Sequence, residues 1–203
     1  MTDKPSVFIV DDEPDVRAAL KLLVGSAGHA VESYPSAQAF LDALPENREG
    51  CLVLDVRMPG MSGLELQKRL AQRELPLPII FISGHGDIPM AVRAMQGGAE
   101  DFLEKPFSDR QLLDRIEKAL ARSREWRQTE QACAQTERNL ASLTPRETEV
   151  MEKLLEGKVN KIIARELDLS TRTVEIHRAR VLQKMAVSNV TQLVGEVMAC
   201  RKR

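Results

Sequence analysis

Five short apolar segments, each followed by a stretch with helical periodicity, dominate the first half of this 203-residue chain. The apolar segments have the length of buried strands, and the stretches between them repeat apolar residues at helical spacing. The predicted strands are 7–10, 30–34, 51–55, 78–83 and 101–104, and the predicted helices between them are 15–27, 36–44, 62–73 and 88–96. Because crossover helices join parallel strands, this alternation predicts a doubly wound, five-stranded parallel α/β sheet.

The segment from Asp109 to Asn139 predicts one long helix or a broken pair of helices. It contains no glycine or proline and is rich in alanine, arginine, glutamine, glutamate and leucine, most of which favour helix. A stripe repeats every seven residues at Leu112, Ala119, Trp126, Cys133 and Leu140. Further apolar residues thicken the stripe only in the first three turns. The second half therefore suits a solvated connecting helix better than a dimerising coiled coil.

The C-terminal part of the chain predicts a small all-α domain of four helices. The run Thr144-Pro145-Arg146-Glu147 combines a cap residue, a proline at the first helical position and an acid in the first turn. The four predicted helices are 145–156, 160–167, 171–185 and 189–200. We therefore divide the chain into an α/β domain at residues 1–122, a helical linker at 123–141 that continues the last helix of that domain, and a helical domain at 142–203.

The overall charge conceals an asymmetry between the two ends of the chain. Residues 1–108 carry 16 acidic and 10 basic side chains, residues 109–141 carry 6 and 7, and residues 142–203 carry 8 and 12. The three net charges of −6, +1 and +4 sum to −1. An acidic first part and a basic last part favour a regulatory domain joined to a domain that binds a polyanion.

Composition also narrows the location of the protein and the role of its cysteines. No segment approaches the roughly 18 consecutive apolar residues of a membrane helix, and the N-terminus lacks the pattern of a secretory signal. We therefore expect a soluble, cytoplasmic protein without a membrane partner. Cys51, Cys133 and Cys200 are far apart and have no metal-binding spacing, so we expect neither a disulfide framework nor a zinc site.

Acidic residues end the first and third predicted strands. Asp11 and Asp12 follow the first strand, and Asp55 ends the third. With the strand order 2-1-3-4-5, the connections reverse direction between these two strands, so the three carboxylates should converge where ligands bind such sheets. Three carboxylates repel one another unless a cation is present, and hard oxygen ligands suit Mg²⁺. Ser83 and Lys105, at the ends of the fourth and fifth strands, add a hydroxyl and a positive charge that suit phosphoryl transfer to a carboxylate.

Four segments of the first domain carry a family resemblance. VDDEP, VLDVRMPGMSG, ISGHGD and EKPF, in this order, resemble the signature segments of response-regulator receivers across residues 1 to about 122. The resemblance implies that Asp55 is the phosphoacceptor. It further implies that Asp11, Asp12, Asp55 and the backbone carbonyl of Arg57 hold Mg²⁺.

The same resemblance implies how the receiver responds to phosphate. Ser83 matches the switch hydroxyl, and Phe102 takes the switch aromatic position where many relatives carry tyrosine. Lys105 matches the lysine of the family that contacts the phosphate, and its peptide bond to Pro106 is expected to be cis. The expected response is a population shift in which Ser83 moves inward, Phe102 follows, and the surface within residues 88–107 is remade. His85 lies where side chains of this family influence the lifetime of the phosphate, although a single histidine in a loop is more often an ordinary surface residue.

A haloacid-dehalogenase-type phosphatase is an alternative that also uses carboxylates on a doubly wound sheet. That family has an Asp-x-Asp pair at the end of its first strand, whereas this chain has Asp11-Asp12-Glu13-Pro14 and its candidate acceptor on the third strand. We therefore do not expect an enzyme that acts on outside substrates, but only self-phosphorylation and autodephosphorylation of the receiver.

The second domain resembles LuxR/FixJ-type helix-turn-helix domains through LTPRETEV and GKVNKIIARELDLSTRTVEIHRARVLQKM. This implies a recognition helix from Thr171 to Met185 that enters the major groove of DNA. The implied DNA-contacting residues are Lys161, Thr171, Arg172, Thr173, Glu175, Ile176, His177, Arg178, Ala179 and Lys184. Glu175, Ile176 and Ala179 match base-facing positions, and the cationic residues suit backbone phosphates. An ordinary charged bundle, or an output that binds protein or RNA, is the alternative.

These features together predict a two-component response regulator of the FixJ/NarL, LuxR-type family. We expect a sensor histidine kinase to phosphorylate Asp55 with Mg²⁺, and the phosphorylated form to bind promoter DNA, as a dimer, and to act with RNA polymerase. Two mechanisms of inactivity stay open. Either the unphosphorylated receiver covers the DNA-binding helix, or phosphate drives dimerisation, which an extended linker helix favours.

Overall fold

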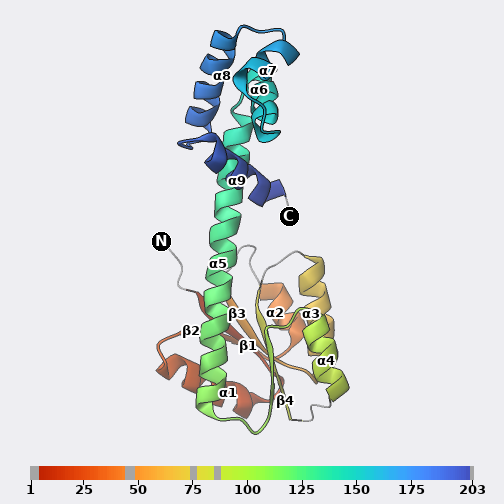
Figure 1. Cartoon of the computed structure of the whole chain (residues 1–203). Helices are drawn as coiled ribbons and strands as arrows, with labels where there is room; N and C mark the ends of the chain where they lie inside the picture. Colours follow the sequence, from red (N-terminus) through yellow and green to blue (C-terminus); the bar gives the residue numbers. More distant parts are fainter. Residues whose placement is uncertain (1–4, 44–48, 74–76, 85–87, 202–203) are drawn as a thin grey trace. The chain divides into compact units, whose positions relative to one another are not determined.

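The computed structural model describes residues 5–43, 49–73, 77–84 and 88–201. The chain divides into two compact units, Met1–Arg127 and Gln128–Arg203, whose helices and strands are labelled in Figure 1. No helix within the described residues is both long and apolar enough to cross a membrane.

The first unit is built on a parallel sheet in the predicted order β2-β1-β3-β4-β5. The strands are β1 (Ser6–Val10), β2 (Ala30–Tyr34), β3 (Gly50–Asp55), β4 (Ile79–Ser83) and β5 (Asp101–Glu104). In the register of the sheet, Val10 pairs with Leu54 and Asp55 pairs with Ile82. The strands that carry the predicted site residues therefore end close to one level, which brings those residues to one edge.

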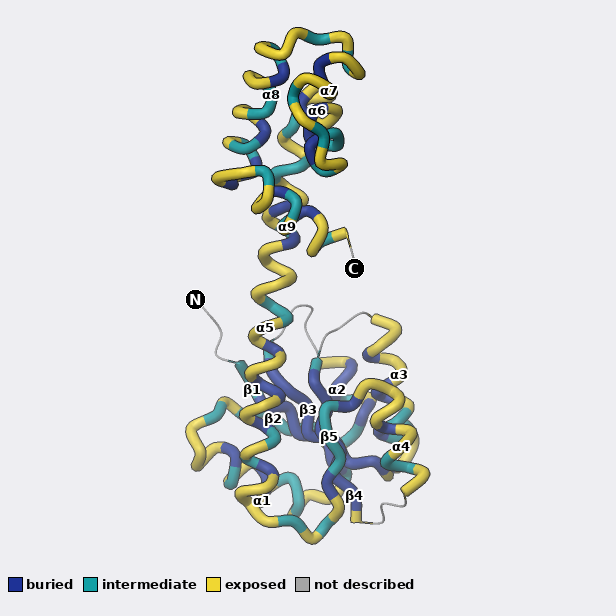
Figure 2. The backbone as a smooth tube through the Cα atoms, in the orientation of Figure 1, coloured by how far each residue is buried: buried dark blue, intermediate teal, exposed yellow. Residues whose placement is uncertain are grey.

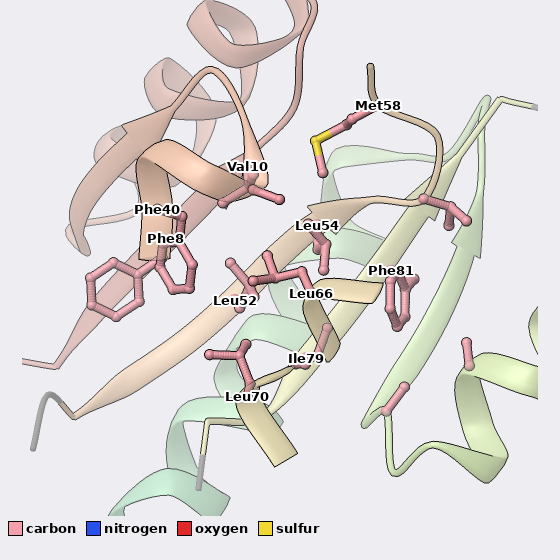
Figure 3. Close-up of a cluster of buried hydrophobic side chains, with 14 of the residues drawn as sticks. Phe8, Val10, Phe40, Leu52, Leu54, Met58, Leu66, Leu70, Ile79 and Phe81 are labelled. Atoms are coloured by element: carbon pink, nitrogen blue, oxygen red, sulfur yellow. The ribbon is translucent and has the colours of Figure 1, made fainter. Parts of the chain in front are cut away.

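Helices cover both faces of the sheet, as Figure 1 shows. They are α1 (Pro14–Ser26), α2 (Ala37–Ala43), α3 (Gly63–Gln72), α4 (Ile88–Gln96) and α5 (Asp109–Ala141). One core cluster joins alternate strand residues such as Phe8 and Leu54 to α2, α3 and α4 (Figure 3). The other joins Ile9 and Val53 to α1 and α5. All six residues of β3 are buried because this central strand has helices on both faces.

A close approach of backbone to backbone joins α3 to the end of β3. Gly63 is the first residue of α3, and its N–H donates to the carbonyl of Val56 at 3.0 Å. A Cβ at position 63 would collide with the carbonyl oxygen of Asp55. Only glycine therefore lets α3 begin so close to the candidate phosphoacceptor.

Gly63→Ala should lower the free energy of unfolding of the first unit by about 1–3 kcal/mol, because the added methyl displaces buried backbone. Gly25→Ala is the matched control, since Gly25 lies in α1 and its Cβ would meet nothing within 4 Å. The control should be neutral or stabilising by up to about 1 kcal/mol. Urea unfolding followed by circular dichroism measures both, and equal stability of the two variants would contradict the packing argument.

The second unit contains the four predicted short helices. They are α6 (Pro145–Leu155), α7 (Asn160–Glu166), α8 (Thr171–Lys184) and α9 (Val190–Arg201). Their buried core includes Val150, Ile163, Val174, Val181 and Leu193. Thr144 and Glu147 form a reciprocal capping box that fixes the start of α6. The fold class is therefore confirmed in both units.

Helix α5 contributes to the core of each unit. Leu112 and Ile116 belong to the core of the first unit, whereas Leu140 packs against the core of the second. Cys133 and Thr136 are also buried, and exposed positions separate the two groups, as Figure 2 shows along the tube of α5. Four residues of the seven-residue stripe, Leu112, Ala119, Cys133 and Leu140, thus pack within the chain, and the ring of Trp126 lies beside Arg122 of the same helix.

The expectation that the cysteines form no disulfide was wrong. Cys133 in α5 and Cys200 in α9 are bonded to each other, and their Cα atoms are 5.3 Å apart, a usual separation for a disulfide. Cys51 remains a free, buried thiol. The sequence could not indicate this pairing because 67 positions separate the partners, and only the packing of α9 beside the end of α5 brings them together.

Candidate functional site

A lysine bridges two buried carboxylates at the edge where β1, β3 and β5 end. The Nζ atom of Lys105 lies 3.2 Å from Oδ2 of Asp11 and 3.4 Å from Oδ1 of Asp55. Asp11 is fully buried, and only 8% of Asp55 is exposed. The structure thus brings together three of the predicted site residues from three different strand ends.

Backbone N–H groups hold these two carboxylates, and one arginine holds the backbone of Asp11. The N–H of Glu13 donates to Oδ1 of Asp11 at 2.9 Å, and the N–H of Arg57 donates to Oδ2 of Asp55 at 2.7 Å. Arg17 in α1 donates from Nη1 to the backbone carbonyl of Asp11 at 2.7 Å. Sequence reasoning missed Arg17. A cation one turn into the helix that follows an acidic strand end is the signal that would have pointed to it.

The ionisation of the cluster reflects burial opposed by close charges. Burial raises the pKa of the Asp55 carboxyl, the charge of Lys105 and the N–H of Arg57 oppose that rise, and the charge of Asp11 adds to it. For Lys105, burial by itself would lower the pKa, but Asp11 and Asp55 outweigh burial and raise it. The site therefore keeps a positive charge on Lys105 and favours the arrival of further positive charge beside the acids.

The donor chemistry of this edge fits a hard divalent cation. Asp12 is half-buried, and within the described part of the chain it has no hydrogen bond or ion pair. Its oxygens and those of Asp11 and Asp55 are the ligands that Mg²⁺ prefers. No group of three or more acidic, histidine or cysteine side chains stands at metal-binding distance among the described residues, and Lys105 lies between Asp11 and Asp55.

Of the predicted switch residues, Ser83 adjoins Lys105 and Phe102 lies further back along β5. Ser83 is 2% exposed, and its carbonyl accepts the N–H of Lys105 at 2.8 Å. The ring of Phe102 is half-buried against Phe81, with ring centroids 6.4 Å apart. The bond from Lys105 to Pro106 is cis, as the resemblance implied. His85, at the position where side chains of this family influence the lifetime of the phosphate, lies outside the described residues.

Helix α8 has one buried face and one polar, exposed face in the second unit. Ser170 caps the helix by accepting the N–H of Thr173 at 3.0 Å. Val174 and Val181 are fully buried. The exposed residues of α8 that we predicted to contact DNA are Thr171, Arg172, Glu175, Ile176 and Ala179. Their helical spacing places most of them on one side of α8, as a recognition helix requires.

The other predicted DNA-contacting residues flank this face. Lys161 in α7 is exposed, and Arg178 donates from Nη1 to Oδ1 of Asn160 at 3.3 Å. Lys161, Arg178 and Thr171 line one hollow with a volume of about 510 Å³. Thr173 and His177 are half-buried, and Nδ1 of His177 is buried with no hydrogen-bond partner within the described part of the chain. With Lys158, which also lines it, the hollow gathers three cations and a hydroxyl, groups that suit contact with a phosphate.

Comparison with known proteins assigns both units. Residues 7–117 match the response regulator receiver domain, and residues 141–197 match the luxR family of bacterial regulatory proteins. This chain is a member of the response-regulator family. The transcriptional regulatory protein FixJ of Bradyrhizobium diazoefficiens is 47% identical over 98% of this chain and 97% of its own length. The response regulator protein TodT of Pseudomonas putida is 46% identical over 96% of this chain and 86% of its own.

Solved structures support the same assignment of this response regulator. A low-resolution structure of the response regulator StyR has a TM-score of 0.85 and 46% identity, and the match covers 97% of this chain and 99% of StyR. Full-length FixJ from B. japonicum has a TM-score of 0.60 and 45% identity over all of both chains. The protein is therefore a two-component response regulator with a receiver domain and a LuxR-type DNA-binding domain, and it regulates transcription.

Lys184 of the response regulator forms polar contacts within the helical unit. Its Nζ lies 2.7 Å from Oε2 of Glu147 and donates to the carbonyl of Ser142 at 2.9 Å. Only 3% of Glu147 is exposed. The hydrogen bond from Lys184, with that from the N–H of Thr144, lowers the pKa of Glu147 to about 2. We predicted that Lys184 contacts DNA; its partners indicate that it also joins the end of α8 to the start of α6.

Lys184→Met should lower the melting temperature of the response regulator by several degrees near neutral pH, because it leaves the buried Glu147 carboxylate without its cation. The pKa of Glu147 is depressed on folding. The stabilisation is therefore complete above pH about 4.5, its ordinary value, and is lost as the pH falls towards about 2.

Arg180→Met is the matched control, since Arg180 is an exposed cation of the same helix. Thermal unfolding of both variants and the wild type between pH 7 and 3 measures the effect. Equal melting temperatures for the two variants at pH 7 would refute a structural role for Lys184.

Proposed function

We propose that a sensor histidine kinase transfers a phosphoryl group to Asp55 of this response regulator, and that the phosphorylated form binds promoter DNA through α8. The observation that carries the proposal is the Lys105 cation between the buried Asp11 and Asp55 carboxylates. A carboxylate at a strand end, held by one N–H and beside a fixed cation, is arranged to act as an acceptor whose new charge is neutralised. The domain limits that we propose are 1–122 for the receiver, 123–141 for a linker helix whose last turns pack on the second domain, and 142–203 for the DNA-binding domain.

In the transfer, a carboxylate oxygen of Asp55 forms a bond to phosphorus as the bond from phosphorus to the histidine nitrogen of the kinase breaks. The electron pair of the broken bond stays with the imidazole. Asp11, Asp12, Asp55 and the carbonyl of Arg57 would hold Mg²⁺, which supplies positive charge to the phosphoryl oxygens. The N–H of Arg57 orients Asp55, and Lys105 moves its ion pair to the phosphoryl group. Autodephosphorylation is the attack of water on the same phosphorus.

The signal then passes to the surface of α4 and β5. The carbonyl of Ser83 already accepts the N–H of Lys105, and the hydroxyl of Ser83 donates a hydrogen bond to a phosphoryl oxygen. The ring of Phe102 then shifts as its packing against Phe81 changes. Helix α4 exposes large apolar side chains, with Ile88 82% and Met95 47% exposed. Such a face supports phosphorylation-dependent dimerisation over masking of the recognition helix. The active dimer works in the cytoplasm together with RNA polymerase.

In the second domain, the exposed face of α8 reads bases and its flanks hold phosphates. Glu175, Ile176 and Ala179 face the major groove, where Glu175 either accepts from a cytosine amino group or excludes other sequences. The positioning contacts to the backbone come from Lys161, Thr171, Arg172, Thr173, His177, Arg178 and Lys184. The exposure of Arg172, Glu175, Ile176 and Ala179 on α8 supports this division of roles.

The first test is fluorescence anisotropy of a promoter duplex with the wild type and with Asp55→Asn, each with and without acetyl phosphate and Mg²⁺. Acetyl phosphate should tighten wild-type binding about tenfold, because only the phosphorylated receiver releases or pairs the DNA-binding domains. The variant carries an amide in place of the carboxylate that accepts phosphate, so it should not respond. A response of equal size in both proteins would overturn the assignment of Asp55.

A salt titration tests the DNA-binding surface separately. Lys161→Ala should reduce the slope of log affinity against log salt by about 1, because one phosphate contact is lost. Lys153→Ala is the matched control, since the ammonium of Lys153 already pairs with Glu156 and Glu166 within the domain. An unchanged slope for Lys161→Ala, or an equal change in the control, would exclude Lys161 from the interface.

A further inference from the structure

The disulfide between Cys133 and Cys200 joins the end of α5 to the last turns of α9. It closes a loop that contains the whole helix-turn-helix, since α6, α7 and α8 lie between the two cysteines. Cys133 is 6% exposed, whereas Cys200 is only half-buried and open to a reagent in solution. A disulfide between a half-buried and a buried cysteine is an arrangement that can be attacked at one end and formed again.

The third cysteine of the chain lacks these properties. Cys51 lies in the central strand β3 and is fully buried. Burial raises the pKa of its thiol to about 12, so it carries almost no thiolate near neutral pH. Cys51 therefore remains a thiol while the other two cysteines change state, which makes it an internal reference for thiol counting.

The disulfide lies in the segment of α5 that contacts the C-terminal end of the recognition helix. Asn139, within two turns of Cys133, donates from Nδ2 to the carbonyl of Met185 at 3.3 Å, directly after the end of α8. Leu140 packs against the core of the same unit. From α8, Lys184 donates to the carbonyl of Ser142 at 2.9 Å. Whatever fixes the end of α5 therefore also restrains the C-terminal end of α8.

A regulator of transcription works beside the chromosome, where thiol reductants keep most cysteines reduced. Disulfides in such a compartment are usually transient and respond to oxidants. We propose that Cys133 and Cys200 form a reversible thiol–disulfide site, through which an oxidant locks the end of α5 onto α9 and tightens DNA binding. This proposal rests on the proposed binding of DNA by α8, and it adds an input that is independent of Asp55.

The reaction requires a disulfide as oxidant, for which glutathione disulfide serves as the probe. The Cys200 thiolate attacks one sulfur of glutathione disulfide, the bond between its sulfurs breaks, and one glutathione thiolate leaves. The Cys133 thiolate then attacks the sulfur of Cys200 and releases the second glutathione. Overall, the two cysteines lose two electrons and two protons, and glutathione disulfide gains them as two thiols.

Preorganisation sets the direction of the effect. In the reduced form the end of α5 is held by the contacts of Asn139 and Leu140, so its motion lets the end of α8 move as well. The disulfide removes that motion before DNA arrives, and binding then costs less conformational entropy. Oxidation should therefore tighten DNA binding a few-fold and raise the melting temperature of the helical unit.

The test uses the full-length protein and a DNA duplex enriched from a random library by the wild type itself. Wild type, Cys133→Ser and Cys200→Ser are equilibrated in buffers of reduced and oxidised glutathione across a range of ratios. Mass spectrometry distinguishes an internal disulfide from glutathione adducts, and a thiol count follows the pair against Cys51. Melting temperature and anisotropy are measured on the same samples.

The expected result is an internal disulfide that forms and breaks across these ratios, with higher melting temperature and tighter DNA binding in oxidised wild type only. Absence of the disulfide at every ratio, or equal DNA affinity of the oxidised and reduced wild type, would overturn the proposal. If neither form binds DNA, the proposed function fails, and the inferred effect on DNA fails with it. The thiol count and the melting temperature still report in that case whether the tether itself forms.

Discussion

The buried contact of Lys105 with Asp11 and Asp55 is the interaction on which the first unit depends. Two carboxylates with little access to water would repel each other, and each would be costly to bury alone. The ε-ammonium between them, at 3.2 and 3.4 Å, offsets that cost. Because the three residues come from β1, β3 and β5, the ion pairs form only when the parallel sheet is assembled in its observed order. The site is therefore assembled as the sheet folds.

Most of this arrangement could be predicted from the sequence, because strand ends carry positional information. A parallel sheet with alternating helices brings every carboxyl end to one edge, so Asp11, Asp55 and Lys105 could be grouped without coordinates. The four helices of the second unit followed in the same way from their caps and turns. In both units, local signals agreed with the global fold.

The features that escaped prediction depend on contacts between distant segments. The pairing of Cys133 with Cys200 has no local signature. The partner of Lys184 was equally hidden, since a cation on a recognition helix suggests phosphate until the buried Glu147 is seen beside it. The capping box of Thr144 and Glu147 did contain a clue. A carboxylate oxygen of Glu147 accepts the N–H of Thr144 and keeps a second lone pair that can accept a hydrogen bond from a cation. Patterns along one helix describe its faces but not what covers them.

The division of α5 between two cores affects how such proteins can exchange modules. Leu112 and Ile116 complete one core, while Leu140 packs against the other. A helical unit cut out at Ser142 would lose the donor to the Met185 carbonyl and the partner of Cys200. Recombination between relatives would therefore succeed when the crossover falls within the exposed turns of α5 upstream of Cys133, so that each module inherits its own part of the shared helix. A boundary drawn where the helix ends would divide a folded unit.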